Sequence, residues 1–329
     1  MKNICPNKIA ILVLAHKNKE QLTKLIREFD DSRFDVFVHI DAKSHMRMDV
    51  PIMKNSFCYI LKRKECVPTY LNDFSLVEAS INLIKAAQEK DRYAYYVLLT
   101  GQDYPIKSNG IIYETLMNSY PTCWIDSYGL DDAYKHGMTW VENVGHKRFS
   151  QRARRLAQKI VGAKFYYSHY GKIVKIPIIA LDILSNMFMP SPRKLVINNE
   201  FTYSAGSHFW MLPDLAVNHI ISVYDNNEKL SYVFKHSSAP EETYFQTALS
   251  TMSKAKIPDP YVQLDSIEKE MDNPALRLIK WYENGEKTSG HPATWTISDF
   301  DVIMKAKALF ARKFEENSDI IKIIDSKLR

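Results

Sequence analysis

KIAILVLA at residues 8–15 is a continuous apolar run, and an amphipathic segment follows it at residues 18–29. The run is too short to span a bilayer and no small-residue cleavage site follows it, so it predicts a buried strand. The alternation continues with a strand-like run at residues 35–40, a helix-like segment at residues 75–88 and a strand-like run at residues 93–100. Strands that alternate with helices in this way predict a parallel sheet with helices on both faces.

Polar residues stand where the three predicted strands end. His16 follows the first strand, Asp41 the second, and Gly101-Gln102-Asp103 the third. Ligands of such sheets bind beyond the carboxyl ends of the strands, so we expect these residues to line one crevice. Turn capping by Asp41 and a satisfied core position for His16 are the structural alternatives.

Length, charge and cysteine content limit the number of domains and the kinds of partner and metal site that this chain can have. The 329 residues suffice for one large or two moderate domains, and the lack of repeats favours a single domain. We expect a nucleotide-binding half at residues 1–125 and an acceptor-binding and catalytic half at residues 126–329. The net charge of +6 suits an anionic partner, such as a nucleotide diphosphate or an anionic membrane, and does not argue for nucleic acid. The four cysteines show no CxxC spacing, so we expect no zinc site, no disulfide framework and a reducing cytoplasm.

Two short segments carry candidate chemistry. Glu241 and Glu242 are adjacent carboxylates at a predicted helix start, and Arg312 and Lys313 lie in the short apolar segment at residues 309–314. A carboxylate can deprotonate an acceptor hydroxyl, and fixed cations can stabilise a departing phosphate. The structural alternatives are an acidic helix start favoured by the helix dipole and an Arg-Lys pair on a solvated helix.

Seven blocks in a characteristic order carry a family resemblance. They are VHIDAK at 38–43, LTGQDYPIK at 99–107, SAGSHFW at 204–210, PEE at 240–242, RLIKW at 277–281, HP at 291–292 and FARKF at 310–314. The chain thereby resembles the core-2/I-branching N-acetylglucosaminyltransferase and protein xylosyltransferase family from about residue 9 to residue 314. The resemblance implies a GT-A type nucleotide-sugar fold, inversion without a metal, and UDP-GlcNAc or UDP-xylose as donor. Animal members carry a membrane anchor and several disulfides, so this chain looks like a bacterial cytoplasmic relative acting on a surface glycan.

The resemblance also implies roles for residues of the donor site. Glu242 holds the place of the general base, and Lys313, with Arg312, faces the departing diphosphate. A second phosphate-facing arginine of the branching enzymes falls at Gly290, where the charge is missing. His291 or Arg312 would substitute for it.

The resemblance also implies which residues contact the acceptor. Trp281 matches a tryptophan that contacts the acceptor sugar, with a core position as the structural alternative. Ser207 and Trp210, in the Gly206-Ser207 block, and Glu241 are expected in the same substrate cleft, where small residues permit close backbone approach.

A metal-dependent mechanism is the alternative that the acidic residues raise. Metal-dependent relatives of this fold carry an Asp-x-Asp pair where this chain has Asp103 alone, and one carboxylate is a poor site for magnesium or manganese. Asp299-Phe300-Asp301 matches Asp-x-Asp literally, but capping of a predicted helix start is the better interpretation. We therefore expect no metal cofactor. A metal-dependent transferase and a non-catalytic glycan- or nucleotide-sugar-binding protein remain alternatives.

Two segments of the second half bear on membrane contact. Residues 147–164 form a basic, helix-like stretch whose interpretations are a solvated face, acceptor recognition, or peripheral docking at the inner face of an anionic membrane. The apolar segment at residues 173–189 is interrupted by charged residues and a proline. We interpret it as buried or interfacial rather than as a membrane span.

Overall fold

The computed structural model confirms the predicted α/β architecture. It describes residues 6–135, 138, 150–162, 165, 166, 168–188, 200–253, 255–257, 275–283, 286–288, 291–316 and 318–328. The central sheet has the strand order β3 (Phe57–Ile60), β2 (Phe34–Ile40), β1 (Ile9–Ala15), β4 (Tyr95–Thr100), β9 (Trp210–Pro213) and β6 (Trp124–Ile125). The first four strands run parallel, with Val13 beside Val38 and Leu99, and β9 is antiparallel to β4. The sheet is therefore mostly parallel, as predicted.

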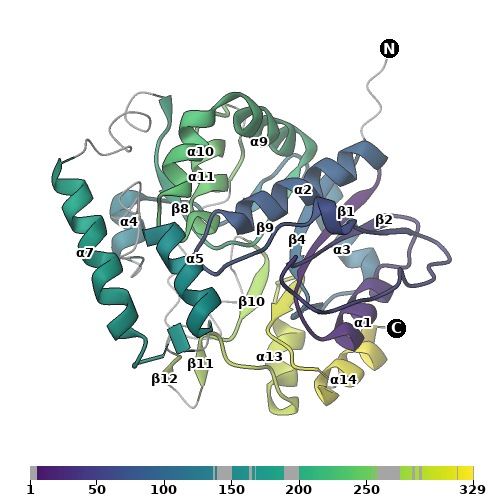
Figure 1. Ribbon diagram of the computed structural model, residues 1–329. Coiled ribbons are helices and arrows are strands. Elements are labelled where there is room, and N and C mark those ends of the chain that lie inside the picture. Colours follow the sequence, from purple (N-terminus) through teal and green to yellow (C-terminus); the bar gives the residue numbers. More distant parts are fainter. Residues whose placement is uncertain are drawn as a thin grey trace.

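Helices cover both faces of this sheet (Figure 1). One face packs on α2 (Ser75–Lys90), α9 (Asp214–Asn226), α10 (Glu228–Lys235) and α11 (Tyr244–Leu249). The other packs on α1 (Lys19–Glu28), α3 (Asn109–Asn118), α13 (Phe300–Lys305) and α14 (Asp319–Leu328). Alternate side chains of β1 point to opposite faces, so Leu12 enters the first core and Val13 the second. Two hydrophobic layers therefore fix the central strands and their carboxyl ends.

A small second sheet joins distant parts of the chain. Its order is β10 (Arg277–Ile279), β13 (Phe310–Arg312) and β5 (Asp103–Pro105). The antiparallel register of β13 and β5 sets Arg312 opposite Asp103. The Arg-Lys pair thus begins at the end of a strand, and the solvated-helix alternative is wrong.

The two sequence halves share the central sheet. Strand β9 comes from residues 126–329 and pairs with β4 and β6 of the first half. The remaining elements are β7 (Tyr128–Gly129), β8 (Ser204–Ala205), β11 (Tyr282–Glu283), β12 (Glu286–Lys287), α4 (Leu130–Lys135) and the 3₁₀ helices η1 (Arg63–Glu65), η3 (Pro240–Glu242) and η4 (Ile297–Asp299).

A helical hairpin lies at one side of the molecule, at the left of Figure 1. Its helices are α5 (Ser150–Val161), inside the predicted basic stretch, and α7 (Lys172–Phe188). Residues 147–149, 163 and 164 of that stretch lie outside the described residues. Most apolar side chains of α7 are exposed, so the buried interpretation of this segment is wrong. Among the described helices, none is long and apolar enough to cross a membrane.

Candidate functional site

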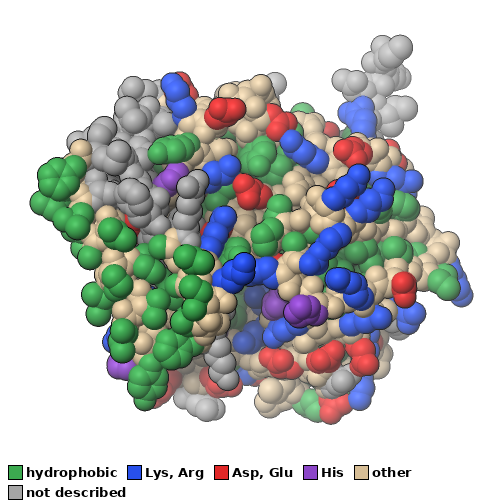
Figure 2. Space-filling model, in the orientation of Figure 1, with side chains coloured by type: hydrophobic (Ala, Val, Ile, Leu, Met, Phe, Trp, Pro, Cys, Tyr) green, Lys and Arg blue, Asp and Glu red, His purple; other side chains and the backbone are tan. Residues whose placement is uncertain are grey.

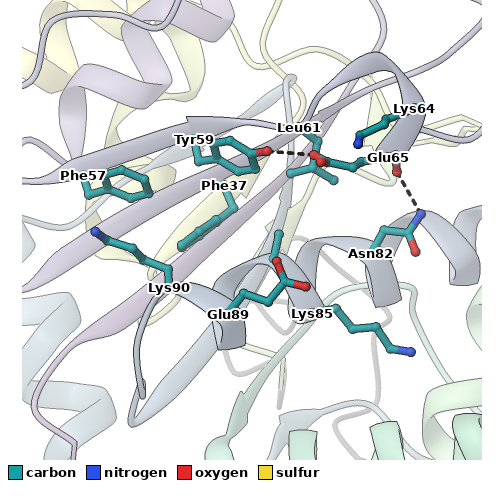
Figure 3. A pocket seen from close by; sticks show the side chains of 11 residues that line it. Phe37, Phe57, Tyr59, Leu61, Lys64, Glu65, Asn82, Lys85, Glu89 and Lys90 are labelled. Carbon is teal, nitrogen blue, oxygen red and sulfur yellow. Dashed lines mark hydrogen bonds between the residues drawn. The ribbon is translucent and has the colours of Figure 1, made fainter.

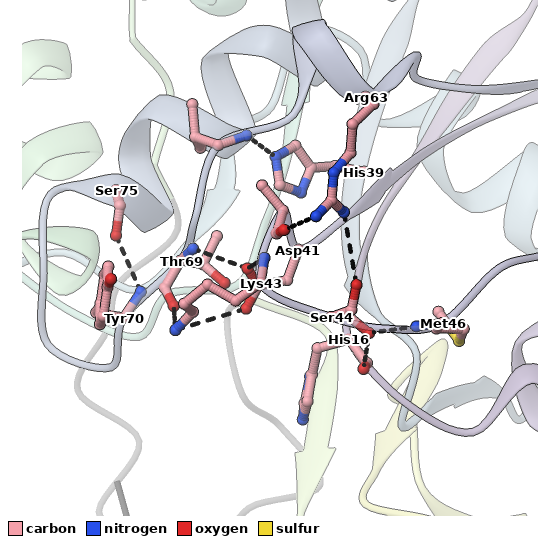
Figure 4. A network of polar contacts seen from close by, with 12 residues as sticks. His16, His39, Asp41, Lys43, Ser44, Met46, Arg63, Thr69, Tyr70 and Ser75 are labelled. Atoms are coloured by element: carbon pink, nitrogen blue, oxygen red, sulfur yellow. Dashed lines mark hydrogen bonds and ion pairs between the residues drawn. The ribbon is translucent and has the colours of Figure 1, made fainter. Parts of the chain in front are cut away.

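Asp41 organises the loop that follows β2 (Figure 4). Its side chain is nearly buried, and its Oδ1 accepts hydrogen bonds from the backbone N–H groups of Lys43 at 2.8 Å and Thr69 at 3.1 Å. The Lys43 ammonium lies 3.7 Å from the Asp41 carboxylate and 3.7 Å from the centroid of the Tyr70 ring. The capping interpretation of Asp41 is therefore correct, and Asp41 holds these two loops together.

His16 contacts the same loop after β2. Its backbone carbonyl accepts a hydrogen bond from the Ser44 hydroxyl at 2.7 Å, and its ring is exposed. Packing against neighbouring atoms lowers the pKa of His16, Lys17 and Arg312 lower it further, and Asp41 opposes them. His16 is not a core histidine, and Asp41 and Arg312 lie near enough to influence its charge.

A buried carboxylate joins two arginines beyond the end of β4. Asp103 is fully buried, and its Oδ1 lies 3.4 Å from Nη1 of Arg277 and 3.7 Å from Nη1 of Arg312. Arg277 also donates to the Leu98 carbonyl at 2.9 Å, and Arg312 donates to the Thr100 hydroxyl. The prediction that Asp103 contacts the donor directly is wrong, because no part of its side chain reaches solvent. Asp103 instead positions the guanidinium groups.

Aromatic rings and a neutral histidine complete this cluster. The guanidinium carbons of Arg277 and Arg312 lie 4.8 and 5.1 Å from the centroid of the Phe209 ring, and that of Arg277 lies 5.0 Å from Phe310. Burial lowers the pKa of His208 to about 3, with further lowering by Arg312 and Arg277. His208 is therefore neutral near pH 7, and two guanidiniums facing one carboxylate leave the cluster with net positive charge.

The backbone around Lys313 is held by hydrogen bonds to Trp295 and Gln102. Trp295 donates from its indole Nε1 to the Arg312 carbonyl at 2.8 Å and from its backbone to the Lys313 carbonyl at 3.0 Å. The Phe314 N–H donates to the Gln102 carbonyl at 3.0 Å. The partly exposed Lys313 ammonium has no hydrogen-bond or ion-pair partner among the described residues. This geometry leaves it available to an anion.

The two adjacent acids occupy different environments. Glu241 is buried, its Oε1 accepts from the Asn72 N–H at 3.0 Å, and its Oε2 has no hydrogen-bond partner within the described structure. Burial, and then the charge of Glu242, raise the pKa of Glu241 well above its usual value. Glu242 is partly exposed, and burial raises its pKa to about 7. The prediction that Glu241 contacts the acceptor is therefore wrong, because its side chain points into the protein.

Residues 206–209 connect the acid to the cationic cluster. The Gly206 N–H donates to the Glu242 carbonyl at 2.8 Å, and the Gln246 side chain donates to the Ser207 carbonyl at 2.9 Å. The next two residues, His208 and Phe209, adjoin the arginines. His208 is two positions after Gly206, a span of at most about 7 Å. Glu242 and Arg312 therefore flank one short segment.

The space around position 206 leaves no room for a side chain, which is why glycine stands there. A Cβ atom at this position would lie 2.0 Å from the backbone oxygen of Asp126. Ser207 is partly exposed, and its hydroxyl donates to the Phe209 carbonyl at 3.4 Å. Trp210 is fully buried and packs 5.3 Å from the Phe245 ring, so its predicted acceptor contact is wrong. In β9 its side chain points into the core.

The remaining predicted residues lie toward the C-terminal sheet. Trp281 is partly exposed, with its carbonyl accepting from the Thr288 N–H at 2.7 Å, and His291 is exposed. Gly290 lies outside the described residues. The Asp299 carboxylate accepts from the Thr296 N–H and pairs with Lys280 at 2.7 Å, which confirms the capping interpretation. Among the described residues, no group of three or more His, Cys, Asp or Glu side chains could hold a metal ion.

Sequence reasoning missed the residues that support the site. Arg277 stands alone in an apolar strand, and a charge there signals a buried partner. Arg154 of α5 donates to the Asn72 carbonyl at 2.6 Å, and Arg155 pairs with Asp73 at 2.6 Å. The charge of Arg154 also lowers the pKa of Glu241 against the larger effect of burial. Helix α5 therefore holds the loop that supports Glu241, and its Arg154 and Arg155 are engaged with that loop rather than forming a solvated face.

A cavity of about 500 Å³ lies elsewhere, between the edge strand β3 and α2 (Figure 3). None of the predicted site residues lines it. The Tyr59 hydroxyl donates to Glu65 at 2.8 Å, the Asn82 side chain donates to the Glu65 carbonyl at 2.9 Å, and Lys90 covers the Phe57 ring at 4.2 Å. The polar groups of Tyr59, Glu65 and Asn82 are thus already engaged with one another. By contrast, Figure 2 shows a hollow near the centre of the molecule, close to β10 and β13, bordered by Lys and Arg side chains.

The architecture and the comparison with known families agree. A mostly parallel sheet with helices on both faces, and with a small second sheet beyond its carboxyl ends, is a GT-A type glycosyltransferase fold. The chain belongs to the Core-2/I-Branching enzyme family, whose model matches residues 9–304. The protein is therefore a glycosyltransferase. A search of curated proteins finds no match to the chain.

Proposed function

We propose that this protein is an inverting, metal-independent glycosyltransferase that moves a sugar from a UDP-sugar to a hydroxyl of a glycan acceptor. The observation that supports the proposal is that the Glu242 carbonyl accepts from the Gly206 N–H while the Arg312 guanidinium lies over the Phe209 ring, so that the acid and the cation before Lys313 both contact residues 206–209. GlcNAc and xylose are the proposed sugars, because the sequence blocks resemble enzymes that use them. A bacterial surface glycan is the proposed acceptor.

Glu242 acts as the general base. A pKa of about 7 leaves a substantial fraction of the carboxylate ionised near neutral pH and makes it a stronger base than an ordinary glutamate. The acceptor hydroxyl gives its proton to Glu242, and its oxygen attacks the anomeric carbon from the face opposite UDP. As the new C–O bond forms, the bond from the anomeric carbon to the β-phosphate oxygen breaks, and its electron pair leaves with UDP.

Arg312 and Lys313 stabilise the leaving diphosphate. The negative charge that grows on the β-phosphate meets one guanidinium fixed by Asp103 and Thr100 and the Lys313 ammonium on a fixed backbone. Arg277 lies too deep to touch the phosphate but adds positive charge from below. It supplies part of the charge expected from an arginine at Gly290.

The proposed metal independence rests on these cations. Asp103 and Asp299, the two acids considered for a metal, are each paired with basic side chains. His16 and Asp41 would border the nucleoside end of the site, and Trp281 and Ser207 the acceptor end. A strongly perturbed acid beside a cationic cluster favours catalysis over a purely binding role.

The test is a transfer and hydrolysis assay with UDP-GlcNAc, UDP-xylose, UDP-glucose, UDP-galactose and UDP-glucuronate, each with and without EDTA. The proposal expects turnover of UDP-GlcNAc or UDP-xylose at a rate that EDTA leaves unchanged, and a product with inverted anomeric configuration by NMR. Loss of turnover in EDTA that manganese or magnesium restores would refute metal independence. Retained configuration would refute the single-displacement mechanism.

A further inference from the structure

Helix α7 presents an apolar surface to the outside. The exposed fractions are 76% for Ile173, 65% for Ile176, 57% for Ile183, 71% for Met187 and 82% for Phe188. Figure 2 shows hydrophobic side chains gathered over α7 and α5 at the left of the molecule. Soluble monomers rarely expose contiguous apolar patches of this kind, and such patches mark interaction sites.

The hairpin exposes large apolar side chains and buries several polar ones. In α5, Arg154 and Gln158 are buried beside Ala157, while Leu156 and Ile160 are exposed. In α7, Ile178 and Asp182 are buried, and the outward arc is apolar. An amphipathic helix of a soluble domain turns its apolar stripe inward. The outer face of this hairpin is therefore matched to an apolar medium.

The length of α7 and the charge of the hairpin indicate which apolar medium the outer face contacts. The 17 residues of α7 measure about 25 Å, which with their composition suits a helix lying along a membrane interface rather than crossing it. The described residues of 150–188 contain six Lys and Arg against a single Asp. Among these cations, Lys159 and Lys172 are exposed beside the apolar face. Basic residues flanking an apolar helix face match a leaflet with anionic headgroups.

We propose that the α5–α7 hairpin is a membrane-docking surface that lies in the interface of an anionic leaflet. The surface comprises the outward faces of α5 and α7 and extends beyond the basic stretch alone. The inner face of α5 holds Asn72 and Asp73 through Arg154 and Arg155, and Asn72 binds Glu241. Docking therefore holds Glu241, and with it the adjacent catalytic Glu242, at a fixed distance from the lipid surface. The proposal does not depend on the transfer reaction.

The test is co-sedimentation of the full chain with vesicles of phosphatidylcholine alone or mixed with phosphatidylglycerol. The variant Ile173→Ser, Ile176→Ser, Ile183→Ser changes only exposed side chains. Ile52→Ser, Leu215→Ser, Ile297→Ser is a matched control, because these residues are also exposed but lie elsewhere. We expect the wild type and the control to bind the anionic vesicles and the α7 variant to bind roughly a hundredfold more weakly.

Sedimentation velocity without vesicles, together with thermal melting, completes the experiment. A wild type that stays in the supernatant with both vesicle types overturns the proposal. If this unbound wild type is a dimer while the α7 variant is a monomer, a second copy of the chain covers the apolar face instead of lipid. If it is a monomer, no lipid covers the face. An unchanged melting temperature of the α7 variant shows that its loss of binding is not unfolding.

Discussion

Asp103 and Arg312 face each other across β5 and β13, with 3.7 Å between carboxylate and guanidinium. The same carboxylate lies 3.4 Å from the buried guanidinium of Arg277. A single buried acid therefore supports both cations beyond the end of β4. The donor half of the proposed mechanism depends on this arrangement.

Asp103→Asn is predicted to destabilise the protein and weaken UDP binding. Removing one partner of a buried ion pair leaves the Arg277 charge uncompensated, which typically costs about 3–5 kcal/mol. Urea unfolding measures the first effect and calorimetry with UDP the second. Asp301→Asn is the control, because Asp301 is exposed on α13. A free energy of unfolding equal to that of the control would contradict the role given to Asp103.

Lys313→Ala is predicted to slow transfer and weaken UDP binding. Loss of one fixed group that stabilises developing charge typically costs about 2.7–4 kcal/mol, which corresponds to roughly 10²–10³ in rate. Steady-state kinetics and UDP titration measure both effects. The exposed Lys305 on α13 provides the matched Lys305→Ala control. Normal rate and affinity in the Lys313 variant would remove this lysine from the diphosphate site.

The pH dependence of kcat/KM is predicted to follow Glu242. Only the ionised carboxylate can accept the proton, and burial raises its pKa to about 7. The rate should therefore fall about tenfold for each pH unit below about 7 and level off above it. A rate profile in buffers of constant ionic strength measures this limb. A midpoint near the ordinary glutamate pKa of 4.5 would show that Glu242 is not the base or is not buried in solution.

Gly206→Ala is predicted to reduce both stability and turnover. The added methyl would overlap the Asp126 carbonyl, and overpacking of this kind costs about 1–3 kcal/mol. The shift would also move Ser207 and His208 between the acid and the arginines. Gly129→Ala is the control, since no atom lies within 4 Å of a Cβ there. Equal melting temperatures and rates for the two variants would contradict the close packing at Gly206.

Much of the fold was predictable because its signals are local. The runs at residues 8–15, 35–40 and 93–100 coincide with β1, β2 and β4 to within two residues, since buried parallel strands read as short continuous apolar segments. The direction of Glu241 was not predictable, because neighbouring acids give no sign of which one points inward. Arg277 and Trp295 were missed as site residues, since their partners are set by the pairing of β13 with β5 and β10. The sequence left open whether α7 is buried or interfacial, because an apolar segment interrupted by charges fits both environments.

The central claim is that Glu242 removes the acceptor proton, and paired glutamine variants test it most directly. Glu242→Gln and Glu241→Gln each replace one carboxylate oxygen by an amide nitrogen in adjacent residues. Of these two residues, Glu242 is partly exposed and Glu241 is buried. Transfer rate and UDP affinity are measured for both. Glu242→Gln should abolish turnover while UDP still binds, and Glu241→Gln should retain most of the activity. A Glu242→Gln enzyme with the wild-type rate would contradict the account.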